Sequence, residues 1–527
     1  MSNLFYRLNH SIGGGALVIA FFTLISKLLG LLRDRLLAGQ FGAGADLDVY
    51  FAAFRLPDFI FNILILGALS VAFIPVFQRV YHQSATAGYR LANSVFNVLL
   101  LAIGLLTIIG LITAGPLVRI LVPGFTAPQI LSTVHLTRIM LISILFFTAS
   151  NVMSGMLNAW KRFVTFSISS VLYNLGIIIG VVFFLPRWGL VGLAWGVVLG
   201  SALHFGIQCT EALIYGWRWQ PIIAVTAELR RLFQLMIPRA IGSTATQINI
   251  VAITMIASWL PIGALSIFNL ANNLQSFPAG LFGISLAVAS FPHITRHAQE
   301  KDYESFSRVF SLQFRRILYV IIPISILLII ERAHVVRVIL GSGSFDWNDT
   351  IMTANVLGIF AVSIFAQGLI PLVSFGFYAH EDTKSPVIIS LITTLINIIL
   401  AFVLTRSLGV IGLTAAFSLA TILNLLLLVG VFKAKIGHLN EKELLNAALR
   451  IALASVIAGA VAYISLRLFL HLIDQRTFWG ILLQGLLSGL SGLAVYIAIS
   501  VIFVFPEIEV LRAYVTRYLR KTRLIKE

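Results

Sequence analysis

The sequence predicts an all-α polytopic membrane protein with about fourteen transmembrane helices, arranged as two pseudo-repeated six-helix lobes plus two C-terminal helices. Of its 527 residues, 59% are hydrophobic and only 11% are charged, and the mean hydropathy is +0.98. Apolar runs recur along the chain, and several exceed the ~20 residues that a membrane-spanning helix needs. A membrane β-barrel is excluded, because it would show alternating segments of about ten residues instead.

The expected spans follow one another closely, with no long soluble insertion. They are placed near residues 15–37, 49–78, 91–116, 134–157, 163–185, 188–213, 232–259, 262–293, 311–331, 350–379, 385–405, 408–432, 446–468 and 478–505. The first has the length of a signal peptide, but no small-residue cleavage site follows it and basic residues come at once. We therefore expect it to be retained as a span.

The distribution of positive charge indicates the topology. The formal net charge is +17, and most of the 37 Lys and Arg residues fall in connections on the same side as the two termini. The positive-inside rule then places both termini in the cytoplasm. The basic tail 512–526 is expected to rest on anionic headgroups. The charge thus predicts contact with membrane lipids and not with nucleic acid.

Two segments repeat at nearly the same offset. Pro75 and Arg79 end the second span as Pro292 and Arg296 end the eighth, 217 residues later, and the Gly-rich start of the sixth span at residue 189 recurs 220 residues later in the twelfth. We interpret this as a duplication, the alternative being chance similarity between apolar helices. The expected domains are an N-terminal lobe (1–219), a C-terminal lobe (220–437) and a last helix pair with its tail (438–527). Such repeats are typical of secondary transporters.

The sequence offers no catalytic constellation, so no enzyme activity and no cofactor are expected. The ten histidines lack metal-ligand spacing, Cys209 is the single cysteine, and no phosphate-binding loop occurs. ATP is therefore not expected as a direct energy source, which leaves the membrane potential or a monovalent cation for coupling. His204, at the middle of the sixth span, is interpreted as a packed, hydrogen-bonded histidine.

Six charged residues lie in the first two spans and form the main functional signal. They are Lys27, Arg33, Asp34, Arg35, Asp48 and Arg55. A charge at the centre of a membrane helix costs roughly 2.5–3.5 kcal/mol and usually faces a cavity or substrate path. Because the group is mostly cationic, it predicts a site for an anion, and arginine and lysine together suit phosphate or pyrophosphate. The alternative is a set of internal salt bridges, for example between Asp48 and Arg33.

Three segments resemble the MurJ (also MviN) lipid II flippases, members of the multidrug/oligosaccharidyl-lipid/polysaccharide exporter superfamily. They are FGAGADLDVYFAAFRLPD (41–58), LNAWKRF (157–163) and FYAHEDTKSP (377–386). The resemblance implies flipping of lipid II (undecaprenyl-pyrophosphoryl disaccharide-pentapeptide) from the cytoplasmic to the outer leaflet by alternating access. It also implies a role in peptidoglycan biosynthesis, with cell-wall synthesis or division proteins as candidate partners.

The resemblance carries family positions onto this chain. Ser26, Lys27 and Arg33 match the basic group of the first span, with Lys27 where the family usually has arginine. Asp48 matches the acid that opens the second span, and Arg138 a basic residue at the start of the fourth. Other family charges are missing, since their positions hold Phe61, Asn272, Asn273 and Ser276.

Arg55 and Arg239 are the candidate replacements for the missing charges, although Arg239 also fits an interfacial arginine that snorkels to the membrane surface. The expected substrate-binding set is therefore Ser26, Lys27, Arg33, Asp48, Arg55, Arg138 and Arg239. The missing charges leave two alternatives to lipid II flipping. One is a flippase for another lipid-linked oligosaccharide of the cell surface, and the other is a scaffold for cell-wall synthesis that transports nothing.

Overall fold

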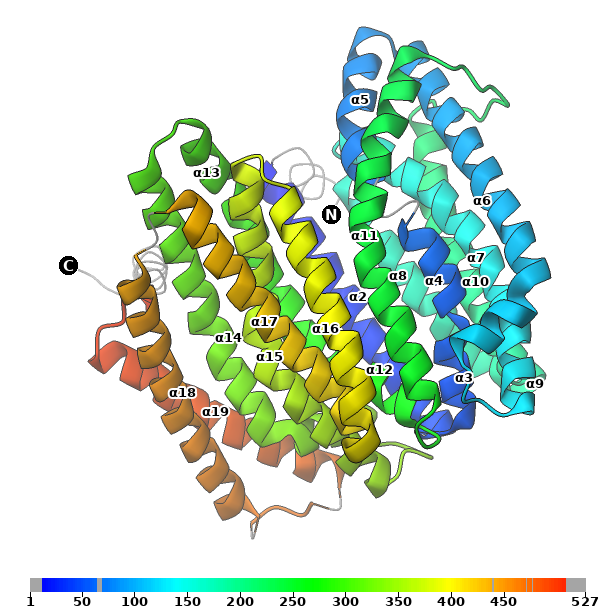
Figure 1. The fold of residues 1–527 in the computed structure, drawn as a ribbon. Coiled ribbons are helices and arrows are strands. Elements are labelled where there is room, and N and C mark those ends of the chain that lie inside the picture. Colours follow the sequence, from blue (N-terminus) through cyan, green and yellow to red (C-terminus); the bar gives the residue numbers. More distant parts are fainter. Residues whose placement is uncertain (1–11, 64–68, 438–439, 471, 476, 509–527) are drawn as a thin grey trace, which may run out of the picture. The chain divides into compact units, whose positions relative to one another are not determined.

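The computed structural model describes residues 12–63, 69–437, 440–470, 472–475 and 477–508, and its elements are helices. The described chain forms two compact units (Figure 1). The first comprises Met1–Asn269 with Ser342–Asp346, and the second comprises Leu270–Gly341 with Trp347–Glu527. This division includes α11 in the first unit, so the lobe boundaries at 219 and 437 stay a prediction about the repeat. The expected basic tail lies outside the described residues.

The first unit is built from α2 to α11 and the start of α12. Its helices are α2 (Ile12–Phe41), α3 (Ala45–Ala53), α4 (Arg55–Phe61), α5 (Leu69–Gln83), α6 (Ala85–Leu121), α7 (Ala127–Ala159), α8 (Phe163–Ile179), α9 (Leu185–Trp188), α10 (Leu190–Ile214) and α11 (Ala227–Ser258). A π-helical turn, Gly180–Phe184, joins α8 to α9. The helix α12 (Ala264–Pro278) begins in this unit and continues in the second.

The second unit continues from α12 through a π-helical segment, Ala279–Ile284, into α13. Its helices are α13 (Ser285–Gln299), α14 (Tyr303–Leu340), α15 (Trp347–Ala379), α16 (Lys384–Leu408), α17 (Val410–Ile436), α18 (Glu441–Phe469) and α19 (Phe478–Ile502). A short 3-10 turn, Pro506–Ile508, ends the described chain. The last two long helices, α18 and α19, pack on each other and on α14.

Eleven helices of the described chain are long and apolar enough to cross a membrane. The three expected spans that are not among them correspond to α2, the segment from α3 to α5, and α11. With these three the chain has the fourteen helical segments that the sequence predicts. Two of the three carry the charged residues of the first two spans.

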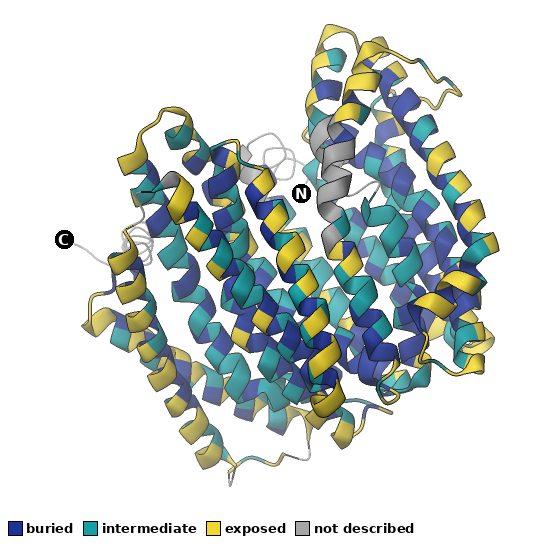
Figure 2. Ribbon diagram, in the orientation of Figure 1, coloured by how far each residue is buried: buried dark blue, intermediate teal, exposed yellow. Residues whose placement is uncertain are grey.

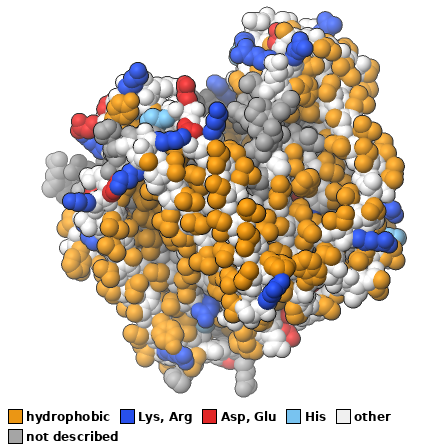
Figure 3. Space-filling view, in the orientation of Figure 1, with side chains coloured by type: hydrophobic (Ala, Val, Ile, Leu, Met, Phe, Trp, Pro, Cys, Tyr) orange, Lys and Arg blue, Asp and Glu red, His pale blue; other side chains and the backbone are white. Residues whose placement is uncertain are grey.

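Apolar side chains cover the outside of each unit, as expected of helices that face lipid. Figure 2 shows exposed positions along the outer faces of helices such as α6 and α18, and these include Leu105, Ile112, Leu453 and Ile457. On the face seen in Figure 3, hydrophobic side chains cover the helices broadly, and Lys and Arg gather toward helix ends. This distribution is the reverse of that of a water-soluble protein, whose exposed face carries the charges.

The two halves repeat each other in local geometry as well as in sequence. Gly189 and Gly409 both have φ near +57°, and each accepts a hydrogen bond from the amide of the glycine three residues on. In the connections after α7 and α15, Lys161 and Glu381 both adopt a positive φ, again 220 residues apart. Unrelated apolar helices would not share these rare turn conformations at one spacing. The duplication inferred from the sequence is therefore supported by backbone geometry.

The connection before α16 is a capping turn built around Asp382. Its carboxylate accepts hydrogen bonds from the amides of Lys384 and Ser385 at 3.1 and 3.0 Å, and Lys435 Nζ of α17 lies 2.7 Å from Oδ2. Partial burial alone would raise the pKa of Asp382, but the hydrogen bonds from Lys435 and Ser385 hold it below its usual value. The stabilisation from this turn is thus present at neutral pH and is lost as the pH falls into the acidic range.

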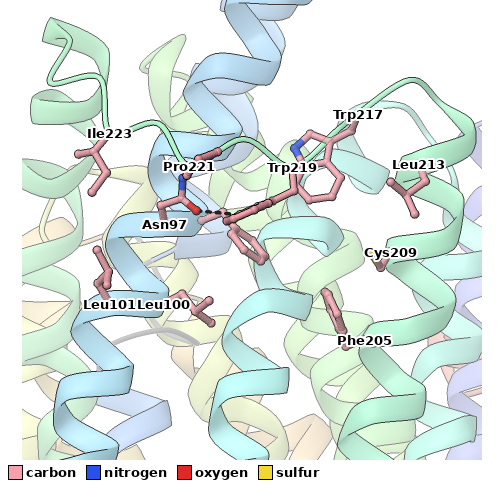
Figure 4. A pocket seen from close by; sticks show the side chains of 11 residues that line it. Asn97, Leu100, Leu101, Phe205, Cys209, Leu213, Trp217, Trp219, Pro221 and Ile223 are labelled. Atoms are coloured by element: carbon pink, nitrogen blue, oxygen red, sulfur yellow. Dashed lines mark hydrogen bonds between the residues drawn. The ribbon is translucent and has the colours of Figure 1, made fainter.

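The segment between α10 and α11 is fastened along α6 by amide side chains. Asn97 Nδ2 donates to the carbonyls of Gln220 and Ile222 at 2.7 and 2.9 Å, and its Oδ1 accepts from the indole of Trp219 at 3.0 Å. Asn93 Nδ2 donates to the carbonyl of Arg218 at 2.9 Å. Figure 4 shows Asn97 and Trp219 among the side chains that line an apolar pocket of about 570 Å³. This connection is therefore an integral part of the first unit.

Glycines bring α8 and α10 into backbone contact. A Cβ atom on Gly176 would lie 2.2 Å from Cα of Gly200, and one on Gly196 would lie 2.6 Å from Cα of Gly180. Small residues at a spacing of four allow membrane helices to approach closely and to gain dispersion energy. The contact fixes α8, which in turn carries Asn174 to the charged helix α2.

We expect Gly196→Ala to destabilise the protein by roughly 1–3 kcal/mol, because the added methyl meets the backbone of α8 and not a movable side chain. The matched control is Gly206→Ala on the same helix, where nothing lies within 4 Å of the new Cβ. That change should be neutral or stabilising, because alanine favours helix. Thermal unfolding in detergent measures both, and equal midpoints for the two variants would contradict the proposed close contact.

Candidate functional site

Arg33 of α2 is held by two neighbours that use three of its donors. Its Nε and Nη2 donate to the same oxygen, Oδ1 of Asp34, at 3.0 and 2.8 Å. Its Nη1 donates to Oδ1 of Asn174 on α8 at 3.2 Å. Because a guanidinium has five N–H donors, two remain for another acceptor. The Arg33 side chain is 21% exposed, whereas that of Asp34 is 4% exposed, so the accessible partner of the pair is the cation.

Asn174 connects Arg33 to Ser26, which lies two turns earlier on the same face of α2. Its Nδ2 donates to the carbonyl oxygen and hydroxyl of Ser26 at 3.2 and 3.1 Å, and the Ser26 hydroxyl donates to the carbonyl of Ser170 at 3.1 Å. Between them lies Gly30, where a Cβ would come 3.8 Å from Asn174 Oδ1. The helix α2 is continuous through Gly30. A Cβ at Gly30 would make only an ordinary van der Waals contact with Asn174, and the glycine does not bend the helix.

Lys27 lies on the same helix, half-buried, one turn and a half before Arg33. In an α-helix, Ser26, Gly30 and Arg33 share the face that meets α8, and Lys27 lies on the adjoining face with Asp34. The structure therefore brings Ser26, Lys27 and Arg33 together on α2. This group, with Asn174 and Asp34, is here called the α2 cation cluster. Their binding of a substrate remains a prediction.

Asp48 has a different environment from the one expected. It is 3% exposed on α3, where its Oδ1 accepts from the amide and hydroxyl of Ser266 at 2.7 and 2.6 Å and its Oδ2 accepts from the amide of Gly263 at 2.6 Å. These amides belong to the start of α12, so the carboxylate caps that helix and opposes the positive end of its dipole. The suggested ion pair between Asp48 and Arg33 is wrong, because Arg33 pairs with Asp34.

Arg55 begins α4 at a break in the second span. Its Nη2 donates to Oδ1 of Asn269 on α12 at 2.5 Å, and its buried Nε has no hydrogen-bond partner. The break follows from Pro57, which has no N–H to offer to the carbonyl of Ala53. The hydroxyl of Thr137 on α7 donates to that carbonyl at 3.3 Å and compensates for the loss. Arg55 is thus tied to α12 and is distinct from the α2 cation cluster.

Of the remaining two candidates, only Arg138 can be placed relative to this cluster. Arg138 is exposed on α7, and its Nε donates to the carbonyl of Leu111 on α6 at 3.1 Å. Arg239 lies in α11, but its side chain is outside what the structure describes. The direction of the Arg138 side chain could not be predicted, because it depends on how α6 and α7 pack.

The positions that lack family charges are occupied by groups that suit their own surroundings. The ring of Phe61 packs against that of Phe147 with centroids 5.5 Å apart. In the second unit, Gln275 Nε2 donates to Oδ1 of Asn272 at 2.9 Å, and Gln367 of α15 donates to Gln275 at 2.9 Å. Phe61 and Asn272 are therefore satisfied by neutral neighbours at positions where the resemblance implies a charge.

The sequence did not identify Asn174 and Asn269, which accept hydrogen bonds from Arg33 and Arg55. Each is a single amide in an apolar run, and a polar residue in a membrane helix is itself a signal of a buried partner. Their partners lie 141 and 214 residues away in the chain, and no local pattern reveals them. The interpretation of His204 is confirmed, because its Nδ1 lies 2.6 Å from the hydroxyl of Ser150.

These features define a class of protein. The described chain has eleven helices that can cross a membrane and helices at the three other expected spans, and a cation cluster lies on α2 in the first unit. Among the described residues no group of three or more metal-binding side chains occurs. The arrangement is that of a multi-pass secondary transporter.

Comparison with known proteins gives the family. The model of the family "Lipid II flippase MurJ" matches residues 37–481, and the chain belongs to this family. It is 30% identical to the probable lipid II flippase MurJ of Bdellovibrio bacteriovorus over 475 residues, which cover 87% of this chain and 88% of the relative. The resemblance noted in the sequence is thereby confirmed.

Solved structures agree with this assignment. A structure of lipid II flippase MurJ in an inward closed conformation matches with a TM-score of 0.77 and 25% identity, covering 92% of this chain and 98% of that one. An inward-facing multidrug resistance MATE transporter of the MOP superfamily matches with a TM-score of 0.66 and 14% identity, over 79% of this chain and 96% of that one. The second likeness concerns the fold alone.

We expect Asp48→Ala to lower the stability of the protein by about 2 kcal/mol, since it removes the cap of α12 and leaves two buried amides without an acceptor. The matched control is Asp46→Ala in the same first turn of α3, where the side chain is exposed. The thermal unfolding midpoint in detergent should fall for the first variant and stay within error for the second. A stable Asp48→Ala variant that loses transport would instead point to a direct role in binding.

Proposed function

We propose that this protein flips lipid II from the cytoplasmic to the outer leaflet of the bacterial inner membrane by alternating access, for peptidoglycan biosynthesis. The observation that carries the proposal is the family match over residues 37–481. The relative from Bdellovibrio and the matched structure both bear the name of lipid II flippase. This agreement favours lipid II over another lipid-linked glycan and over a scaffold without transport.

The α2 cation cluster is the proposed holder of the pyrophosphate. Arg33 keeps two N–H donors beyond those bound to Asp34 and Asn174, and Lys27 adds a second positive charge on the adjoining face. In the absence of substrate, Asp34 acts as the resident counter-ion that offsets the cost of a buried guanidinium. On arrival of the pyrophosphate, Arg33 exchanges part of its bonding from Asp34 to phosphate oxygens. Because Asp34 remains beside it, the reverse exchange assists release.

The membrane potential is the proposed driving force, with a monovalent cation as the second possibility. The potential is negative inside, so it drives an anion outward. Each elementary charge that crosses is worth about 2.3 kcal/mol per 100 mV. The protein needs no cofactor or catalytic group for this task, since its work is to supply alternating polar environments for one head group.

We also propose how the chain is oriented in the membrane and which parts of it move. Both termini lie in the cytoplasm by the distribution of Lys and Arg, and the six-helix lobes 1–219 and 220–437 are the bodies that rock. Residues 438–527 form the additional helix pair and tail. Membrane lipids and proteins of cell-wall synthesis or division are the proposed partners beyond the substrate.

We expect Arg33→Ala to abolish growth of cells depleted of their own lipid II flippase and to lower outer-leaflet lipid II about ten- to a hundredfold. This range corresponds to the ~1.5–3 kcal/mol that hydrogen bonds to a charged group contribute. Arg33→Lys should give an intermediate result, because it keeps the charge and loses the planar fork. Lys27→Ala should be weaker than Arg33→Ala, since a single point charge is removed. The measurement is accessible lipid II at the outer surface, in cells with equal amounts of inserted protein.

Arg308→Ala is the control for loss of a positive charge. Arg308 is exposed on α14 and pairs with Glu304 one turn away, so this variant should support growth like the wild type. Wild-type protein that inserts normally but restores neither growth nor outer-leaflet lipid II would contradict the lipid II assignment. An Arg33→Ala variant as active as the wild type would contradict the role of the α2 cation cluster.

A further inference from the structure

A second ionisable group lies deep in the second unit, apart from the α2 cation cluster. Glu331 of α14 is 6% exposed, and neither of its carboxylate oxygens has a hydrogen-bond partner, because the nearby hydroxyl of Ser488 donates to the carbonyl of Ala462 at 2.7 Å. The nearest titratable neighbour is His334 on the next turn, whose Nδ1 lies 3.5 Å from Oε2 of Glu331. An ionised carboxylate without hydrogen bonds is among the most costly groups to bury. The burial of the Glu331 carboxyl group therefore needs a physical explanation.

The carboxyl group faces the contact of α14 with α19. Gly492 and Gly485 of α19 let that helix approach, since a Cβ on the first would meet Leu327 at 2.9 Å and one on the second would lie 3.5 Å from Oε2 of Glu331. Further along, the hydroxyl of Tyr496 donates to the carbonyl of Tyr319 at 2.8 Å. Pro323 leaves that carbonyl without its helical partner. The two helices thus meet through a continuous seam, and Glu331 lies within it.

The hydrogen bonds at this end of the seam fix the tautomer of His334. Gln484 of α19 donates its Nε2 to the carbonyl of Leu466 on α18 at 2.9 Å, and a carbonyl can only accept. The amide oxygen of Gln484 therefore points the other way, where it lies 3.2 Å from Nε2 of His334. An oxygen at that place requires an N–H on Nε2. In a neutral imidazole the other nitrogen, Nδ1, then has a lone pair and no hydrogen.

This leaves the Nδ1 lone pair facing the carboxylate of Glu331, an arrangement of two acceptors that is repulsive. One additional proton removes the conflict, either as O–H on Glu331 that donates to Nδ1 or as N–H on Nδ1 that donates to the carboxylate. We propose that Glu331 and His334 form a proton-binding site that holds a single shared proton and fastens α19 to α14. The proton comes from water and returns to water, through the partly exposed side of His334.

Other charged groups near the pair are turned elsewhere. On α14 itself, the Arg332 side chain lies against Gly358 of α15, and that of Arg337 lies against Gly341. On α18, the guanidinium of Arg467 donates to the hydroxyl of Tyr463. The sequence of α19 contains no charged residue, and that of α15 contains only Asp349, in its first turn. His334 is thus the ionisable partner that the geometry assigns to Glu331.

The consequence is a pH-dependent contact between helices. While the proton is bound, the chain of hydrogen bonds from Leu466 through Gln484 and His334 to Glu331 is complete and joins α18, α19 and α14. When the proton is lost at high pH, a bare carboxylate faces a lone pair in a site of low dielectric, and this opposes close packing. The inference does not depend on the proposed transport function.

The test is the thermal unfolding midpoint of the full-length protein in detergent, measured from about pH 6 to about pH 9. In the unfolded chain, histidine releases its proton near pH 6.5, so a folded pair that keeps its proton binds more protons above that pH. Stability should therefore fall as the pH rises, by up to a tenfold change in the folding equilibrium per pH unit. Glu331→Gln should abolish this slope, because its amide N–H donates permanently to Nδ1 of His334. Glu304→Gln, at an exposed position of the same helix, should keep it.

A Glu331→Gln variant with the slope of the wild type would overturn the proposal. So would a stability that depends on Na⁺ at constant pH and ionic strength, since a metal ion and not a proton would then hold the two acceptors together. Should Glu331→Gln fail to fold, infrared spectra of the wild type provide the second measurement. A band of a buried carboxylic acid, or of an imidazole protonated on both nitrogens, that disappears as the pH rises and changes in Glu331→Asp supports the site, and the absence of both bands would overturn it.

Discussion

The requirement that every polar group within the hydrocarbon find a partner governs this structure. Prolines free backbone carbonyls inside the helices, and hydroxyls of neighbouring helices compensate, as Thr137 does for Ala53 and Tyr496 for Tyr319. In water such carbonyls would be solvated, but in lipid each costs several kcal/mol when it is left alone. These contacts do more than satisfy hydrogen bonds. They specify which helices are neighbours and at what register, a task that hydrophobic burial alone cannot perform where lipid is as apolar as the side chains.

The same requirement explains how charges persist at membrane depth. Asp48 is stabilised by the start of α12, and Arg33 by an adjacent acid and an amide of α8. The two arrangements differ in what they allow. The carboxylate of Asp48 is fully enclosed and has no accessible donor or acceptor left for a ligand. Arg33 retains free N–H donors and partial exposure, so it can exchange partners. A charged side chain can therefore bind a ligand only where it is accessible and still has hydrogen-bond donors or acceptors that the protein does not use.

The sequence predicted most of the fold because its strongest signals are local. Apolar length determines the spans, and the shared turns at Gly189 and Gly409 mark the repeat in both sequence and backbone. The site could be predicted only in part. The basic residues of α2 stand out by their cost, but Asp48 and Ser266 meet across 218 residues, and Arg138 turns outward to Leu111 because of how α6 and α7 pack. Periodicity gives the face of a helix, whereas the identity of its neighbour is a property of the tertiary structure.

The neutral residues at family charge positions bear on how the α2 cation cluster must act. Where Phe61 packs on Phe147, a cation would need a counter-ion that the aromatic neighbours do not supply. The amide chain from Asn272 through Gln275 to Gln367 likewise satisfies its own members without a net charge. A site with fewer cations attracts an anion less strongly at rest, and it also holds the anion less tightly at release. Since a transporter must both bind and let go, the loss of charge at these positions is compatible with transport, provided that Arg33 and Lys27 carry the recognition.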